Sequence, residues 1–277
     1  MLQSPRLRWS LVPLVFLAAL AADGLRAPRQ QRHAPLARDA APSPCPQWPE
    51  EAAELAAIER KFELLDAYTR ANGNPDFHDR KWGIASLALY AQNKTTFVFR
   101  ALRKRFAPTA SPVICELGFN AGHSSMLMLE ALPRASVVSF DLGDFAWSAN
   151  ERLFSRVYGA RFEFVRGDSA VTLPNFAHLS CEVLFIDGSK DTDARAADVR
   201  NFRAVARPGA LLLLDEVSSE ACVRGKISEA ECVAAPHSDY APTSIAYHRL
   251  SREGVIRVDE CIETITKGDG FCSATLL

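Results

Sequence analysis

Short apolar runs alternate with amphipathic stretches through the middle of the chain, between residues 112 and 215. Five of these runs have the length and composition of strands: Pro112–Leu117, Ser136–Asp141, Arg161–Val165, Glu182–Asp187 and Ala210–Asp215. The stretches around 147–158 and 193–206 show the apolar spacing of helices. Strands that alternate with helices predict a doubly wound α/β fold, with a mostly parallel sheet covered by helices on both faces.

An acidic residue stands at or just beyond the carboxyl end of each of the five predicted strands. The acids are Glu116, Asp141, Asp168, Asp187 and Asp215. Parallel strands present their carboxyl ends at one edge of a sheet, and ligands of such sheets bind beyond that edge. The sequence therefore predicts a functional site where these side chains gather.

Two helical stretches precede the first strand. Glu50–Ala71 carries apolar residues at helical spacing and ends at an Asn-Gly-Asn-Pro stop, and a second stretch runs from about Trp82 to Phe106. We expect residues 50–108 to form an N-terminal helical cap and residues 109–277 to form the main domain.

Beyond Glu216 the alternation ends. Thr243–Leu250 and Val255–Ile262 are interpreted as two strands joined by a turn at 251–254. Short loops between cysteines close readily, so the expected disulfides are Cys222 with Cys232 and Cys261 with Cys272, although spacing alone does not settle connectivity. Cys115 and Cys181 lie in or beside buried strands, where we expect inert thiols, and Cys45 is left over.

The first 22 residues have the pattern of a secretory signal peptide. Arg6 and Arg8 precede the apolar run Leu11–Leu20, and Ala19-Leu20-Ala21 offers a cleavage site. The run is short for a membrane span, so an uncleaved signal anchor is the weaker alternative. Residues 23–49 are rich in Pro, Ala and Arg and are interpreted as a disordered stem or pro-segment.

The leader predicts the lumen of the secretory pathway or secretion. A bipartite leader to a plastid is a further alternative. In the secretory route, Asn93-Lys94-Thr95 is a glycosylation sequon, and the cysteines can pair.

Composition and charge exclude some partners. The chain is 48% hydrophobic and 23% charged, which suits a globular domain with a sizeable core. Its formal net charge of -1 gives no electrostatic reason to expect binding to nucleic acid or to an anionic membrane surface.

A glycine-rich turn follows the first strand, in the pattern Glu116-x-Gly118-x-x-x-Gly122-x-Ser124. A dinucleotide fingerprint requires glycine where Asn120 stands, so a nucleotide-dependent oxidoreductase is poorly supported. The turn instead resembles motif I of class I S-adenosylmethionine (SAM) methyltransferases, in the form found in catechol-type O-methyltransferases and in the methyltransferase domain 24 group. That resemblance implies a seven-stranded sheet with antiparallel C-terminal strands.

The same resemblance assigns roles in binding SAM. Gly118, Gly122 and the N–H groups around Ser124 would receive the carboxylate of SAM, and Glu116 would hold its ammonium group directly or through water. Asp141 would accept the ribose hydroxyls, as acids at this position do in nucleotide-binding folds. Asp168 or Ser169 would lie near the adenine, and Asp187 also belongs to the expected cofactor contacts. Helices before motif I commonly cover the cofactor, which makes His78, Lys81 and Trp82 candidates for a lid.

A second cluster combines Asp187-Gly-Ser-Lys190-Asp191 with Asp215-Glu216. It resembles the D-x-x-K-D and D-N motifs of catechol-type enzymes, with Glu216 in place of the Asn. The resemblance implies Mg²⁺ bound by Asp187, Asp215 and Glu216, a hard cation among oxygen ligands. Lys190 and Asp187 are the candidate catalytic residues, with Lys190 as the general base. The domain 24 group usually has His at the position of Lys190, which makes this departure informative.

The resemblance implies a SAM-dependent methyltransferase that acts on a hydroxyl of a small substrate, with Mg²⁺ assistance as an option. The alternative is a catalytically inactive methyltransferase fold that serves as a binding or interaction module in the secretory pathway.

Overall fold

The computed structural model describes residues 49–72, 89–235, 238–262 and 270–277. The predicted leader, the stem up to residue 48, Cys45 and the lid candidates His78, Lys81 and Trp82 lie outside these ranges. Within them, no helix combines the length and the apolar character needed to cross a membrane.

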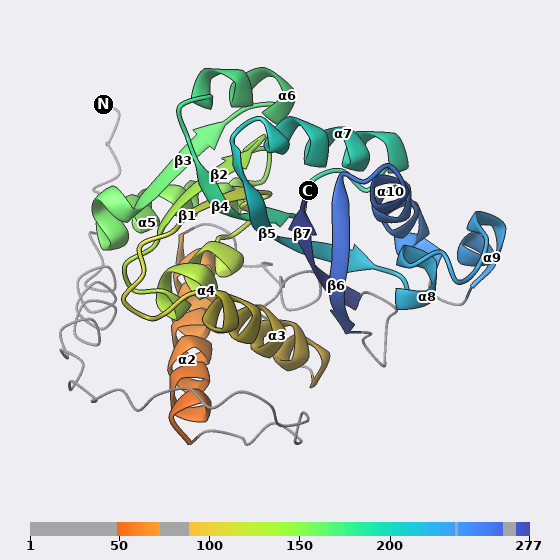
Figure 1. Cartoon of the computed structure of the whole chain (residues 1–277). Coiled ribbons are helices and arrows are strands. Elements are labelled where there is room, and N and C mark those ends of the chain that lie inside the picture. Colours follow the sequence, from red (N-terminus) through yellow and green to blue (C-terminus); the bar gives the residue numbers. More distant parts are fainter. Residues whose placement is uncertain (1–48, 73–88, 236–237, 263–269) are drawn as a thin grey trace, which may run out of the picture.

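The chain folds around a seven-stranded sheet with the strand order β3-β2-β1-β4-β5-β7-β6 (Figure 1). Neighbouring strands among the first five run parallel, whereas β7 runs antiparallel to both β5 and β6. The strands are β1 (Val113–Leu117), β2 (Ser136–Asp141), β3 (Phe162–Arg166), β4 (Cys181–Ile186), β5 (Ala206–Val217), β6 (Ile256–Ile262) and β7 (Gly270–Leu276). The order reverses between β1 and β4, which is the point where sheets of this kind bind their ligands.

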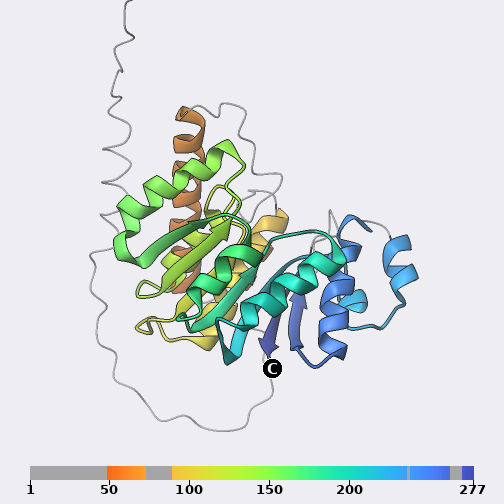
Figure 2. The same ribbon diagram turned by 90° about the horizontal axis from the view of Figure 1, so that it is seen from above.

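Helices cover both faces of the sheet, as the alternating pattern predicts (Figures 1 and 2). One core joins the sheet to α2 (Pro49–Ala71), α3 (Leu89–Arg105), α4 (His123–Ala131) and α5 (Glu151–Tyr158). The other core joins it to α7 (Thr192–Arg203), α8 (Glu220–Val223) and α10 (Ala241–Arg252). Shorter elements complete the chain: η3 (Ala146–Asn150), η4 (Gly159–Arg161), α6 (Ser169–Thr172), η5 (Leu173–Phe176), α9 (Glu229–Ala234) and η6 (Ser238–Tyr240).

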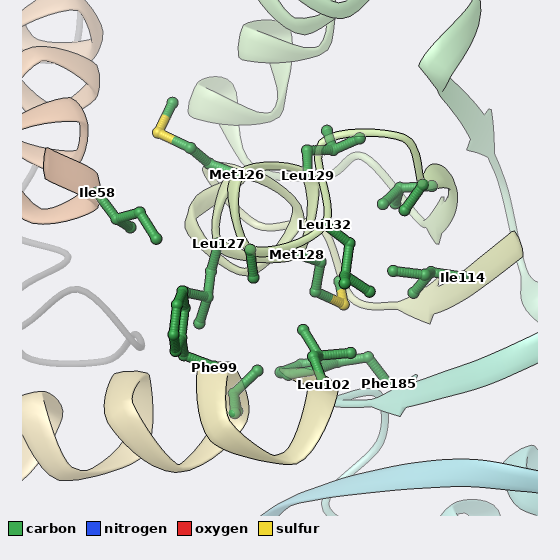
Figure 3. Close-up of a cluster of buried hydrophobic side chains, with 14 of the residues drawn as sticks. Ile58, Phe99, Leu102, Ile114, Met126, Leu127, Met128, Leu129, Leu132 and Phe185 are labelled. Carbon is green, nitrogen blue, oxygen red and sulfur yellow. The ribbon is translucent and has the colours of Figure 1, made fainter. Parts of the chain in front are cut away.

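Every residue of helix α4 except Glu130 is buried, and its apolar part, Met126–Leu129, is enclosed by its neighbours (Figure 3). Its side chains meet α2 at Ile58, α3 at Phe99 and Leu102, and the sheet at Ile114 and Phe185. A helical segment that is hydrophobic all round is stable only when it is buried. The two N-terminal helices therefore supply the cover that α4 needs, and α4 in turn begins at the functional edge of the sheet.

The C-terminal prediction is wrong in one element. Thr243–Leu250 forms part of helix α10, and the second antiparallel strand is β7, which the sequence pattern does not predict. Ile245 and Tyr247 alternate as in a strand, but Ala246 and Leu250 share one helical face. Pro242 in the first turn is the helix signal that was missed.

Three cysteine pairs stand at disulfide distance. Cys222–Cys232 and Cys261–Cys272 confirm the two expected local bridges. The third pair, Cys115–Cys181, contradicts the expectation of inert thiols. It joins β1 to β4, which are neighbours in the sheet although the two cysteines are 66 positions apart in the chain.

Candidate active site

The turn between β1 and α4 is shaped by two glycines in the left-handed region of backbone conformation. Gly118 has φ 96° and Gly122 has φ 97°, values that L side chains rarely adopt. A Cβ on Gly118 would lie 2.3 Å from the carbonyl oxygen of Asp187, and one on Gly122 would lie 2.6 Å from the ring of Phe154. Both glycines thus let the turn pack closely, which brings the start of α4 to the carboxyl ends of β1 and β4.

Asp141 lies at the end of β2 and organises the turn. One carboxylate oxygen, Oδ2, accepts hydrogen bonds from the backbone N–H groups of Phe119 at 2.7 Å and Asn120 at 3.1 Å. The other oxygen, Oδ1, accepts from the N–H of Gly143 at 2.6 Å. The side chain is only partly buried, and a carboxylate oxygen can accept two hydrogen bonds, so Oδ1 can take one more. Asp141 is therefore held rigidly and still has capacity for a ligand.

Helix α4 begins beside Asp141, and no side chain of the described residues caps it. The first N–H groups of a helix have no partner within the helix and carry partial positive charge. In α4 these groups belong to the residues from His123 onward, including the predicted Ser124. This N-terminus is suited to a carboxylate or a phosphate.

Glu116 is fully buried beneath the turn. Its carboxylate accepts hydrogen bonds from the hydroxyls of Ser124 and Ser125 on α4 and of Ser139 on β2. Burial raises the pKa of Glu116 to about 7 despite these three bonds. The side chain thus fastens the first turn of α4 to the sheet, and its full burial leaves no exposed surface for direct contact with an ammonium group.

The predicted adenine contacts follow β3. Asp168 is exposed and caps α6, because its Oδ1 accepts the N–H of Ala170 at 2.9 Å. Ser169 is buried, and its hydroxyl lies 3.4 Å from Oδ1 of Asp198 on α7. Asp168 therefore already has the structural role of a helix N-cap.

The second predicted cluster does come together beyond β4 and β5. Lys190 pairs with Oε1 of Glu216 at 2.6 Å and is about half exposed. Two cations that sequence reasoning missed complete the cluster. Lys94 of α3 pairs with Oδ1 of Asp215 at 2.6 Å, and Arg195 of α7 pairs with Oε2 of Glu216 at 2.7 Å.

Arg195 holds the cluster together from below. It is fully buried and donates to the backbone oxygens of Ile186 at 2.8 Å and Ser189 at 2.5 Å, as well as to the hydroxyl of Tyr247 at 3.1 Å. The loop after β4 is thereby tied to α7, α10 and the end of β5. In the sequence, Arg195 stands alone among alanines near the start of a predicted helix. No local pattern indicates which residues it contacts.

Asp187 differs from the other two acids of the cluster. Within the described residues its carboxylate accepts no hydrogen bond and forms no ion pair, and it is partly exposed. Burial and the nearby charges of Asp215 and Glu216 hold its pKa well above the usual range, against the opposing effect of Arg195 and Lys94. Asp187 is thus the open carboxylate at the centre of the site.

Comparison with known proteins identifies the fold that carries this geometry. Residues 115–217 match the family model described as a methyltransferase domain. The fold is that of a class I methyltransferase. No curated protein matches the chain.

Solved structures share the methyltransferase fold at low sequence identity. The O-methyltransferase TomG from Streptomyces achromogenes, solved in complex with SAM, is 20% identical, with a TM-score of 0.50 over 83% of this chain and 91% of that chain. The SAH-bound methyltransferase PaMTH1 from Podospora anserina is 17% identical, with a TM-score of 0.50 over 86% of this chain and 100% of that chain. Likeness at this level establishes the fold and leaves the substrate open.

A divalent metal does not fit the acidic edge of this methyltransferase fold. The expected ligands Asp187, Asp215 and Glu216 are neighbours, but Asp215 and both oxygens of Glu216 are engaged by Lys94, Lys190 and Arg195. No group of three His, Cys, Asp or Glu side chains in the described ranges is arranged to hold a metal ion. Asp191 of the D-x-x-K-D pattern instead caps α7 through two backbone N–H groups, each at 3.0 Å.

Proposed function

We propose that the chain is a SAM-dependent methyltransferase that methylates a hydroxyl group of a small molecule. The observation that carries the proposal is the uncapped start of α4 beside the rigidly held carboxylate of Asp141. These two features offer a positive end for the carboxylate of SAM and an acceptor for its ribose hydroxyls, next to each other at the switch point of the sheet. The methyltransferase fold supports the same assignment.

In this proposal the N–H groups of His123 to Ser125 bind the SAM carboxylate, and Asp141 binds the ribose. Asp168 or Ser169 lies toward the adenine, and Glu116 keeps the first turn of α4 in place from below. SAM, when bound, supplies an electrophilic methyl group on a sulfonium centre. The remaining task of the protein is to position a hydroxyl group and to accept its proton.

Asp187 is the proposed proton acceptor. A carboxylate with a raised pKa, without a hydrogen bond among the described residues, is suited to receive a hydroxyl proton on one of its oxygens. Lys190 is less suited to this role. Burial is the largest single influence on the pKa of Lys190 and lowers it, but the hydrogen bond to Glu216 together with the nearby charges of Glu216 and Asp187 outweighs burial, so the pKa is raised and the amine stays protonated. Lys190 is then a cationic group at the rim that orients the acceptor.

The test is isothermal calorimetry of SAM with the full chain and with Asp141→Ala. We expect micromolar binding to the wild type and a loss of at least about tenfold in the variant, because charge-assisted hydrogen bonds are removed. The matched control is Asp144→Ala, which removes an exposed carboxylate from the same loop and should leave binding unchanged.

Two outcomes would contradict the proposal. Binding of NADH in place of SAM would favour the oxidoreductase that the glycine pattern disfavours. Absence of SAM binding by folded protein would favour the inactive interaction module instead.

A further inference from the structure

Among the described residues, six acidic and basic side chains meet at the carboxyl ends of β4 and β5, and their formal charges balance. The three acids are Asp187, Asp215 and Glu216, and the three bases are Lys94, Lys190 and Arg195. With all six ionised the charge sums to zero. A cluster without net negative charge offers little attraction to a divalent cation, whatever its supply of oxygen atoms.

Lys94 is the unusual member, because it comes from a helix that precedes the first strand of the sheet. It lies on α3 and reaches Asp215 across 121 positions of sequence. Its side chain is only 5% exposed and that of Asp215 is 6% exposed. Both charges are thus removed from water. A buried charge is strongly destabilising unless an opposite charge lies beside it.

The Lys94 ammonium lies where a metal ion bound to Asp215 would have to lie. Oδ1 of Asp215 accepts the Lys94 ammonium at 2.6 Å and the backbone N–H of Glu216 at 2.7 Å. The charge of Lys94 acts in addition on Asp187, the open carboxylate. A metal bound to Asp215 and Asp187 would have to displace this buried ammonium.

We propose that the Lys94 ammonium permanently occupies the cation position of this site, so that the chain binds no divalent metal there. The second part of the inference rests on the proposed function. A methyltransferase that lacks a chelated metal gains nothing from two adjacent hydroxyls on its acceptor. The acceptor class is therefore a small molecule with a single reacting hydroxyl, held by Asp187 and the cationic rim at Lys190, rather than a catechol.

To test this, the full chain is titrated with Mn²⁺, a paramagnetic substitute for Mg²⁺. The concentration of free Mn²⁺ is followed by electron paramagnetic resonance. The wild type should leave the free Mn²⁺ signal unchanged into the millimolar range. K94M removes the ammonium and keeps an unbranched side chain, so Asp215 and Asp187 are no longer neutralised. We expect Mn²⁺ affinity to rise by at least about tenfold in K94M and not in K94R, which retains the charge.

K61M is the matched control. Lys61 is also a buried lysine of the N-terminal helices, and it pairs with Glu130 at 2.8 Å, away from the acidic edge. Loss of this pair should weaken folding without creating a Mn²⁺ site. Circular dichroism establishes which variants are folded.

Stoichiometric Mn²⁺ binding by the wild type would overturn the inference, and so would a folded K94M without any gain in Mn²⁺ affinity. If K94M does not fold, the wild-type titration still tests whether the site binds a divalent metal. SAM binding measured on the same samples separates the two proposals: loss of SAM binding counts against the methyltransferase, whereas the Mn²⁺ result counts only for or against the role of Lys94.

Discussion

Single residues in this site act mainly through what surrounds them. Glu116 has the sequence position of a cofactor ligand, yet three serine hydroxyls enclose its carboxylate completely. Gly118 has the position of a residue that admits a ligand, yet the atom nearest to its missing side chain is the carbonyl oxygen of Asp187. In both cases the motif residue builds the turn that leads into α4.

Burial of Glu116 should make stability depend on pH. Its pKa rises from 4.5 to about 7 on folding, so the unfolded chain loses this proton first. The stability that the protonated Glu116 contributes to the folded state is fully present below pH 4.5 and is lost as the pH rises to about 7. Glu116→Gln has no such proton and can keep hydrogen bonds with the serines. Between pH 4.5 and 7 the wild type should lose about 3 kcal/mol of unfolding free energy relative to the variant.

Urea denaturation of both proteins across this pH range measures the difference. A constant gap between wild type and Glu116→Gln would show that the carboxyl group titrates normally and that the site is wetter than its burial indicates.

Gly118→Ala should be far more destabilising than an ordinary glycine replacement. The new Cβ would overlap the carbonyl oxygen of Asp187 at 2.3 Å, in addition to the unfavourable φ of 96°. We expect a loss of at least about 3 kcal/mol. Gly254→Ala is the control, because Gly254 has φ 70° but no atom near its missing side chain, so only the conformational cost of about 1–2 kcal/mol applies. Equal losses in thermal unfolding would rule out the close contact.

At the scale of elements, α4 links the glycine-rich turn after β1 to the N-terminal helices α2 and α3. The apolar part of the helix is buried, and Leu102 of α3 is one of the fully buried residues that enclose it (Figure 3). Leu102→Ala should cost about 2–5 kcal/mol, because it leaves a cavity in this core. Leu142→Ala removes the same atoms from a side chain that is 58% exposed and should change little. Chemical denaturation compares the two, and a similar loss in both would contradict the packing of α3 against α4.

How well the elements could be predicted depended on how local their signals are. The five parallel strands and their acidic ends follow from short apolar runs, and the structure does gather those acids at one edge. The sequence pattern predicts a strand where α10 forms, because Ile245 and Tyr247 alternate with polar or small residues as in a strand. Pro242, in the first turn, is the local signal for a helix. The ion pair of Lys94 with Asp215 and the pairing of Cys115 with Cys181 depend on which elements become neighbours, and no local pattern encodes that.

At the scale of the whole molecule, the strand that completes the sheet is the one that comes last in the chain. β7 lies between β5 and β6, and Phe271 near its start packs against Phe97 of α3 with ring centroids 5.7 Å apart. The N-terminal cap and the sheet therefore share a contact that does not exist until β7 is in place. Because a nascent chain emerges from its N-terminal end, the ribosome must release nearly all of this sequence before the sheet can close. Until then the apolar surfaces of α3 and β5 stay exposed, which makes synthesis the stage at which this protein most needs protection from aggregation.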